Sequence, residues 1–208
     1  MTLGQLRPNG VSNPLLLSAI EQVNREKFLP PSLQEMAYCD HSLQINPETF
    51  LLEPLVLARL IQALDIQPGD KVLHVNCGTG YGTALLARMG AQVYALASSP
   101  SQAQQVQANL AQENILATIH HGSFSDGLVT EGPFQAILIE GAIDTIPITL
   151  RRQLVEGGYL AAVCYFESNS GMITLWQKTG KQVTISKKYH EGSAPRLKAF
   201  HEHVGFMF

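Results

Sequence analysis

The feature that most constrains the fold is the glycine-rich segment 76–82, which reads Asn-Cys-Gly-Thr-Gly-Tyr-Gly. It follows the apolar run 71–75 and precedes 83–89, a segment that is typical of a helix and is followed by Gly90. A glycine-rich turn after the first strand of a doubly wound sheet lets the backbone approach a ligand where side chains would clash. The segment therefore predicts a strand, a ligand-binding loop and a helix in an α/β domain.

The spacing of the loop glycines indicates which ligand the loop suits. Dinucleotide sites usually need glycines at the first, third and sixth positions, where the helix N-terminus receives a pyrophosphate. Here the glycines are Gly78, Gly80 and Gly82, and the sixth position is Thr83. This spacing favours S-adenosylmethionine, which has no phosphate. A tight turn without any ligand stays an alternative, and a P-loop is excluded because no Gly-Lys-Ser/Thr follows.

The rest of the chain alternates between strand-like and helix-like patterns. The expected strands after the loop are 92–96, 117–120, 134–139 and 159–166, and the expected helices are 13–28, 54–64, 100–112 and 148–155. The alternation predicts βαβ units and a parallel sheet covered on both faces. The tail differs: 172–178 and 182–188 flank a Thr-Gly-Lys turn as an antiparallel hairpin, and 204–208 offers a further edge strand. We therefore predict a Rossmann-like α/β fold with a mostly parallel seven-stranded sheet and an antiparallel edge.

Length and composition suit one such domain. The chain has 208 residues, of which 45% are hydrophobic. Its expected parts are an N-terminal helical and substrate-loop extension (1–65), a nucleotide-binding core (70–166) and C-terminal antiparallel strands (171–208). The net charge of −3 and the scattered Lys and Arg residues argue against a nucleic-acid partner.

The three cysteines, Cys39, Cys77 and Cys164, form neither a disulfide framework nor a CxxC pair. This usage favours a reducing compartment. The N-terminal residues 1–10 contain no apolar stretch that could serve as a signal peptide, and the longest apolar run, 159–166, is far shorter than a membrane span. We therefore expect a cytoplasmic protein without a membrane partner. The sequence gives no indication of the oligomeric state.

Several segments together resemble a known family. They are 5–11 (Gln-Leu-Arg-Pro-Asn-Gly-Val), 23–30 (Val-Asn-Arg-Glu-Lys-Phe-Leu-Pro), 37–40 (Ala-Tyr-Cys-Asp), 78–87 and 154–158 (Leu-Val-Glu-Gly-Gly). The chain resembles the protein-L-isoaspartate O-methyltransferase family over nearly its whole length, particularly its shorter bacterial branch. The resemblance implies a class I methyltransferase fold and methyl transfer from S-adenosylmethionine to isoaspartyl carboxylates of damaged proteins. An ionised carboxylate needs no general base, so positioning and exclusion of water suffice.

The resemblance also implies site residues. Those expected to bind the cofactor are Cys77, Gly78, Thr79, Gly80, Tyr81, Ser98, Ser123, Phe124 and Glu140. Those expected to bind the substrate are Phe50, Leu51 and Leu52. No catalytic side chain and no metal ligand is expected.

At five positions the sequence departs from the family pattern. Family members carry an acid and a glycine at His74 and Asn76, a ribose-binding acid at Ala97, an aspartate at Ser123 and a serine at Leu52. A hydrogen bond to a charged group is worth about 1.5–3 kcal/mol, so these changes weaken the expected cofactor contacts. Two hypotheses stay open: a working carboxyl methyltransferase with weakened or unusual cofactor contacts, and a non-catalytic relative that acts as a binding or regulatory protein.

His74 and Cys77 invite functional interpretations of their own. His74 is expected either to be a core histidine with its own hydrogen-bond partner or to contact whatever occupies the pocket. Cys77 stands at a helix N-terminus, where thiol pKa values tend to fall. We nevertheless expect it to be a small space-filling residue.

Overall fold

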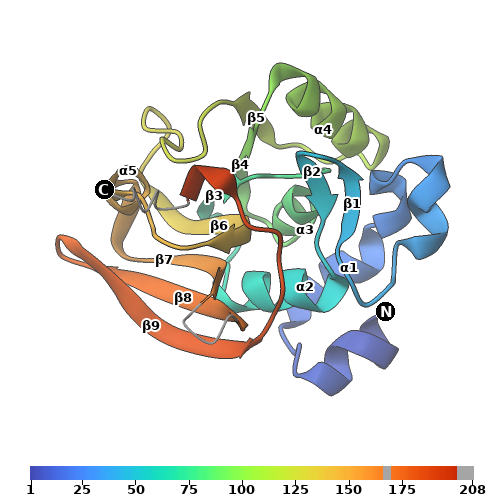
Figure 1. The fold of residues 1–208 in the computed structure, drawn as a ribbon, viewed down its shortest axis with the longest axis horizontal. Helices are drawn as coiled ribbons and strands as arrows, with labels where there is room; N and C mark the ends of the chain where they lie inside the picture. Colours follow the sequence, from blue (N-terminus) through green and yellow to red (C-terminus); the bar gives the residue numbers. More distant parts are fainter. Residues whose placement is uncertain (166–169, 201–208) are drawn as a thin grey trace, which may run out of the picture.

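A seven-stranded sheet forms the centre of the molecule, with the strand order β5-β4-β3-β6-β7-β8-β9 (Figure 1). We examined it in a computed structural model that describes residues 1–165 and 170–200. The strands are β3 (Lys71–Val75), β4 (Gln92–Ala97), β5 (Thr118–His121), β6 (Phe134–Ile143), β7 (Leu154–Tyr165), β8 (Gly171–Thr179) and β9 (Gln182–Glu191). The expected edge strand 204–208 and the last residue of the expected strand 159–166 lie outside the described residues.

Strands β3 to β7 pair in parallel, whereas β8 is antiparallel to both of its neighbours. The predicted Rossmann-like arrangement with an antiparallel edge is therefore confirmed. The chain runs from β3 to β4 on one side and later returns to place β6 on the other side of β3. In open α/β sheets, ligands bind outside the carboxyl ends of the strands at such a reversal.

The described residues contain five α-helices: α1 (Pro14–Gln22), α2 (Pro54–Ala63), α3 (Tyr81–Arg88), α4 (Pro100–Gln112) and α5 (Ile148–Arg152). Helix α2 packs against β7 and β8, and α4 packs against β4 and β5. Within this part of the chain, no helix is both long enough and apolar enough to cross a membrane.

The expected helix 13–28 is wrong in its second half. Asn13 is the N-cap, as predicted, because its side chain accepts a hydrogen bond from the backbone of Leu16. The helix ends at Gln22, since Val23 is extended, and a separate 3-10 turn, η3 (Arg25–Phe28), follows. The break turns Arg25 into the protein, where it is buried. Similarly, the expected helix 148–155 ends three residues earlier, and β7 begins at Leu154.

An antiparallel hairpin of β1 (Leu43–Asn46) and β2 (Thr49–Leu51) was not predicted. It occupies the segment expected to be a substrate loop. The Asn46 side chain closes its turn by accepting hydrogen bonds from the backbone N–H groups of Glu48 (3.0 Å) and Thr49 (2.8 Å). Figure 1 shows this hairpin beside α4, near the carboxyl ends of the central strands.

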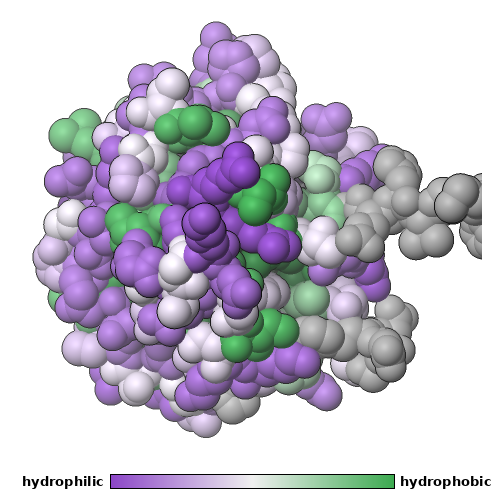
Figure 2. All heavy atoms as spheres, turned by 90° about the vertical axis from the view of Figure 1, so that its left-hand side faces the viewer, coloured by the Kyte–Doolittle hydropathy of each residue, from purple (hydrophilic) through white to green (hydrophobic). Residues whose placement is uncertain are grey.

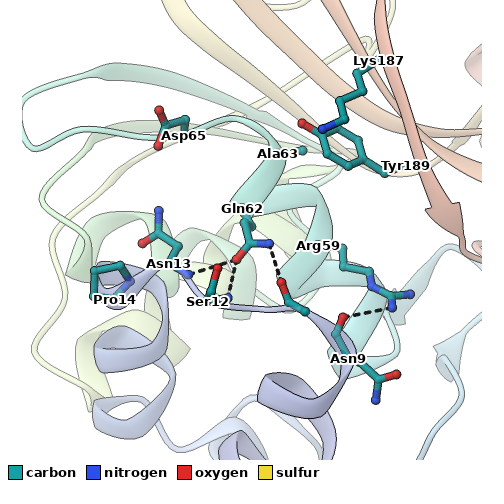
Figure 3. A pocket seen from close by; sticks show the side chains of 11 residues that line it. Asn9, Ser12, Asn13, Pro14, Arg59, Gln62, Ala63, Asp65, Lys187 and Tyr189 are labelled. Atoms are coloured by element: carbon teal, nitrogen blue, oxygen red, sulfur yellow. Dashed lines mark hydrogen bonds between the residues drawn. The ribbon is translucent and has the colours of Figure 1, made fainter.

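A polar pocket of about 520 Å³ lies between the N-terminal turn, α2 and β9 (Figure 3). Gln62 of α2 lies at its centre. Its Oε1 accepts hydrogen bonds from the backbone N–H groups of Ser12 (2.7 Å) and Asn13 (3.0 Å), and its Nε2 donates to the carbonyl of Gly10 (3.0 Å). Because both the oxygen and the NH2 group of the carboxamide bond to the backbone of residues 10–13, Gln62 links the N-terminal segment to α2.

After β9 the chain returns across the end of β6. The backbone of Ala142 bonds Pro195 and Leu197, both at 2.9 Å, and the Leu197 side chain packs against Gly141. The side of the molecule that carries α5 and the β8–β9 hairpin is mostly hydrophilic, with hydrophobic residues in separate small patches (Figure 2).

Candidate functional site

A groove of about 930 Å³ opens beside the glycine loop, where the strand order reverses. Gly78 and Thr79 form its inner end, and Ser98 and one face of α4 along its whole length form one wall. The opposite wall is Lys27–Pro31 with the turn of the β1–β2 hairpin. Lys27 and Glu48 are the charged residues among those that line it.

Helix α4 presents a stripe of carboxamides to this groove. Gln102, Gln105, Asn109 and Gln112 line it, and their spacing places them on one helix face. Gln105 donates to the Asn109 side chain (2.9 Å), and Asn109 donates to the carbonyl of Thr79 (2.9 Å). The stripe thus joins α4 to the glycine loop through neutral polar groups.

Gln102 connects three walls of the groove and was missed by the sequence analysis. Its Oε1 accepts hydrogen bonds from the backbone N–H (2.7 Å) and the hydroxyl (2.9 Å) of Ser98. Its Nε2 donates to the carbonyl of Gly78 and to the hydroxyl of Thr49, both at 3.2 Å. These hydrogen bonds join segments that are distant in sequence, so no local sequence pattern indicates them. The spacing of the carboxamides along 100–112 was the one signal available.

His74 and Glu140 form a buried pair beneath the glycine loop. His74 Nε2 lies 3.1 Å from Glu140 Oε2, and His74 Nδ1 lies 2.9 Å from the Thr83 hydroxyl. Asn76 donates from its side chain to the Glu140 carbonyl (2.7 Å). His74 and Glu140 are 0% and 1% exposed, and Glu140 Oε1 is buried without a hydrogen-bond partner. His74 is therefore a core histidine with its own partners, and two of the residues that depart from the family pattern contact Glu140.

Arg25 links the end of the β1–β2 hairpin to Tyr81, the first residue of α3. Its guanidinium donates to the carbonyls of Ala37 (2.6 Å) and Leu52 and lies 4.9 Å from the ring centre of Tyr81. Burial lowers the pKa of this guanidinium. The arrangement is tight, because a Cβ on Gly78 would come within 2.9 Å of the carbonyl of Phe50.

The expected cofactor residues fall into three groups. Gly78, Thr79 and Ser98 line the groove, and the Thr79 hydroxyl is buried without a partner. Cys77, Tyr81 and Glu140 are buried, and Gly80 is the residue before α3. Ser123 and Phe124 follow β5 and are not among the residues that line the groove. For all nine residues, the assignment as a cofactor ligand stays a prediction.

The expected substrate residues Phe50, Leu51 and Leu52 are buried and do not line the groove, so their role also stays a prediction. Burial raises the pKa of the Cys77 thiol to about 12, which agrees with a space-filling residue. Among residues 1–165 and 170–200, no cluster of His, Cys, Asp and Glu could hold a metal ion.

Comparisons with known proteins agree with this geometry. The family model of protein-L-isoaspartate(D-aspartate) O-methyltransferases matches residues 2–192. A Methylorubrum populi protein-L-isoaspartate O-methyltransferase is 36% identical over 156 residues, covering 75% of this chain and 74% of the relative. One from Gloeobacter violaceus is 31% identical over 186 residues, covering 89% and 91%.

Solved structures show the same fold. A Plasmodium falciparum protein described as a protein-L-isoaspartate O-methyltransferase, solved in complex with S-adenosyl-L-homocysteine, has a TM-score of 0.75 at 21% identity. The match covers 93% of this chain and 94% of that one. With the family model matching nearly the whole length, the chain belongs to the protein-L-isoaspartate O-methyltransferase family.

Proposed function

We propose that this chain transfers a methyl group from S-adenosylmethionine to the α-carboxylate of isoaspartyl residues in damaged proteins. The observation that carries the proposal is the groove at the strand reversal, walled by the glycine loop, in a chain whose family match spans residues 2–192. The structural relative from Plasmodium falciparum was solved in complex with S-adenosyl-L-homocysteine, the product that methyl transfer leaves behind.

The groove suits this cofactor in size and in chemistry. A volume of about 930 Å³ is in the range of ligand sites. Adenosine and a zwitterionic amino acid need hydroxyl and amide partners, which Ser98 and the carboxamides of α4 offer. The buried Thr79 hydroxyl has no hydrogen-bond partner among the described residues, and a buried polar group without a partner favours a ligand that supplies one.

The proposed chemistry makes few demands on side chains. When bound, S-adenosylmethionine supplies an electrophilic methyl group on a sulfonium sulfur. The acceptor carboxylate is already ionised at neutral pH, so the chain needs to orient it and to exclude water. Arg25 contributes by fixing the end of the hairpin at Leu52 against Tyr81 of the loop helix. These contacts support a role of the hairpin as a rigid wall of the groove in which we propose that methyl transfer occurs.

Two measurements test the proposal. Calorimetry should show S-adenosyl-L-homocysteine binding, and tritiated S-adenosylmethionine should label an isoaspartyl peptide but not its aspartyl counterpart. Thr79→Tyr, which fills the inner end of the groove, should abolish both signals. Thr130→Tyr, at an exposed position away from the groove, should leave them unchanged. Absence of binding at millimolar ligand would contradict the proposal and favour the non-catalytic alternative, for which Ala97 at the end of β4 is the motivating observation.

A further inference from the structure

We propose that the Gln102 carboxamide binds the sugar hydroxyls of the nucleoside part of the cofactor, in place of a carboxylate at the end of β4. The inference rests on the proposed function and names a specificity-determining residue for it. Its starting point is Ala97 at the end of β4, next to the groove residue Ser98.

Nucleotide-binding sites in this fold usually have a polar side chain at the end of the strand that corresponds to β4. In doubly wound sheets, an acidic residue about 20 residues beyond the glycine loop accepts hydrogen bonds from ribose hydroxyls. The residue at that place is Ala97, which is fully buried and has no polar side-chain atom. The backbone N–H and the hydroxyl of the next residue, Ser98, both donate to Gln102. Directly beyond β4 the polar side chains are thus the Ser98 hydroxyl and the Gln102 carboxamide that accepts its hydrogen bond, and Gln102 belongs to helix α4.

The orientation of the carboxamide follows from its partners. The backbone N–H of Ser98 can only donate, so the oxygen of Gln102 must face it (2.7 Å). The carbonyl of Gly78 can only accept, so the NH2 group must face the glycine loop (3.2 Å). Gln102 therefore holds its oxygen against β4 and directs its two N–H donors toward the loop and the hairpin.

The two ends of the carboxamide are held unequally. The bonds to Oε1 measure 2.7 and 2.9 Å, whereas both bonds from Nε2 measure 3.2 Å, at the long end of the usual range. One Nε2 partner is the Thr49 hydroxyl, which belongs to the hairpin and lines the groove. A ligand oxygen that enters between hairpin and loop can replace this bond while Ser98 keeps the carboxamide in place.

This geometry reverses the usual direction of the hydrogen bond. A carboxylate accepts hydrogen bonds from the sugar hydroxyls, whereas the Gln102 NH2 group donates a hydrogen bond to a sugar oxygen. A neutral hydrogen bond is worth about 0.5–1.5 kcal/mol, which corresponds to a factor of about 2 to 13 in affinity. The loss of the acid at Ala97 is then offset only in part, and nucleoside binding is weakened without being abolished.

The test is a coupling experiment with S-adenosyl-L-homocysteine and its 2′-deoxy and 3′-deoxy analogues, measured by calorimetry. The unaltered protein should bind one of the two analogues about threefold to tenfold more weakly than the parent compound. Gln102→Leu should bind the parent more weakly by a similar factor and should no longer distinguish that analogue from it. The matched control is Gln107→Leu, which makes the same change on the exposed side of α4 and should behave like the unaltered protein.

The outcomes separate the two proposals. If the unaltered protein binds S-adenosyl-L-homocysteine but neither analogue is weaker, or if Gln102→Leu keeps the full discrimination, the role of Gln102 is wrong and the proposed function stands. If the unaltered protein binds no S-adenosyl-L-homocysteine at millimolar concentration, both the role of Gln102 and the proposed function are wrong. Circular dichroism tests whether each variant is folded. If Gln102→Leu is not folded, Gln102→Met, which keeps the length of the side chain, takes its place in the experiment.

Discussion

Gly82 and Glu140 are in contact beneath the glycine loop: a Cβ on Gly82 would lie 2.7 Å from Glu140 Oε2. It would also lie 2.8 Å from His74 Cε1. The third glycine of the loop is therefore required by the buried pair of the protein itself. The spacing of glycines that favours S-adenosylmethionine in the sequence is, at this position, a packing requirement.

The first prediction concerns Gly82→Ala. Within a helix, alanine is ordinarily favoured over glycine by about 1 kcal/mol. Here we expect a loss of about 1–3 kcal/mol in the free energy of unfolding, because the added methyl group overpacks a filled space. Urea denaturation gives the value. Gly4→Ala is the control, because no atom lies within 4 Å of a Cβ at that position, and it should change stability little. Unchanged or increased stability of Gly82→Ala would contradict the packing argument.

The His74–Glu140 pair should be strongly coupled. His74→Leu leaves the buried Glu140 Oε2 without its hydrogen-bond partner, and a buried polar group left unsatisfied typically costs about 1–3 kcal/mol. The double variant His74→Leu/Glu140→Leu removes both polar groups, so it should be more stable than the sum of the single changes indicates. A double-mutant cycle from urea denaturation measures the difference. Additive effects would mean that the two side chains do not depend on each other.

Arg25 should be irreplaceable by lysine. A lysine keeps the charge but lacks the planar fork that reaches the carbonyls of Ala37 and Leu52 together. Losing one charge-assisted hydrogen bond in a buried position should lower the free energy of unfolding by about 1.5–3 kcal/mol. Thermal unfolding of Arg25→Lys checks this, with the exposed Arg7→Lys as a control that should match the unaltered protein. Equal midpoints for the two variants would show that the fork is dispensable.

Cys77 should be inert toward alkylation in the folded protein. The thiolate is the reactive form, and burial holds the thiol pKa at about 12. At pH 8, iodoacetamide should modify the half-buried Cys39 well before Cys77, and both should react once the chain is unfolded in urea. Peptide mass spectrometry resolves the sites. Rapid native labelling of Cys77 would mean that the loop opens readily.

The same pKa shift predicts a loss of stability in alkali. Because the Cys77 pKa is raised in the folded state from 9.0 to about 12, the folded chain keeps a proton that the unfolded chain releases. The stabilisation is complete below pH 9 and is lost as the pH rises to about 12, at about 1.4 kcal/mol per pH unit. Urea midpoints between pH 8 and pH 10.5 follow the decline. Cys77→Ala should show a shallower decline, and an identical slope would assign the effect to other groups.

The parts of the fold that could be predicted are those with a local cause. β3 and α4 have the predicted bounds, because an apolar run ends at the loop and because Ser99 and Pro100 begin a helix. Ser99 is its N-cap and accepts a hydrogen bond from the backbone of Gln102. Periodicity and capping are properties of a few consecutive residues, so they can be recognised in a sequence.

The parts that could not be predicted depend on tertiary contacts. The helix expected over 13–28 ends early because Arg25 turns inward toward Ala37 and Leu52, which lie further along the chain. Gln102 matters because Thr49, Gly78 and Ser98 meet around it. For the site, the sequence located the glycine loop and Ser98. The groove wall made by the hairpin and by α4 required the structure.

The packing of α2 against β7 and β8 has a consequence for the order of synthesis. Residues 54–63 leave the ribosome about 90 residues before β7 begins. At about 5–20 residues per second, the apolar side of this helix is without its native partner for about 5 to 20 seconds. During that interval the apolar side of α2 has to be shielded by other means, although every residue that lines the groove is made before β7 begins, since the last of them is Gln112.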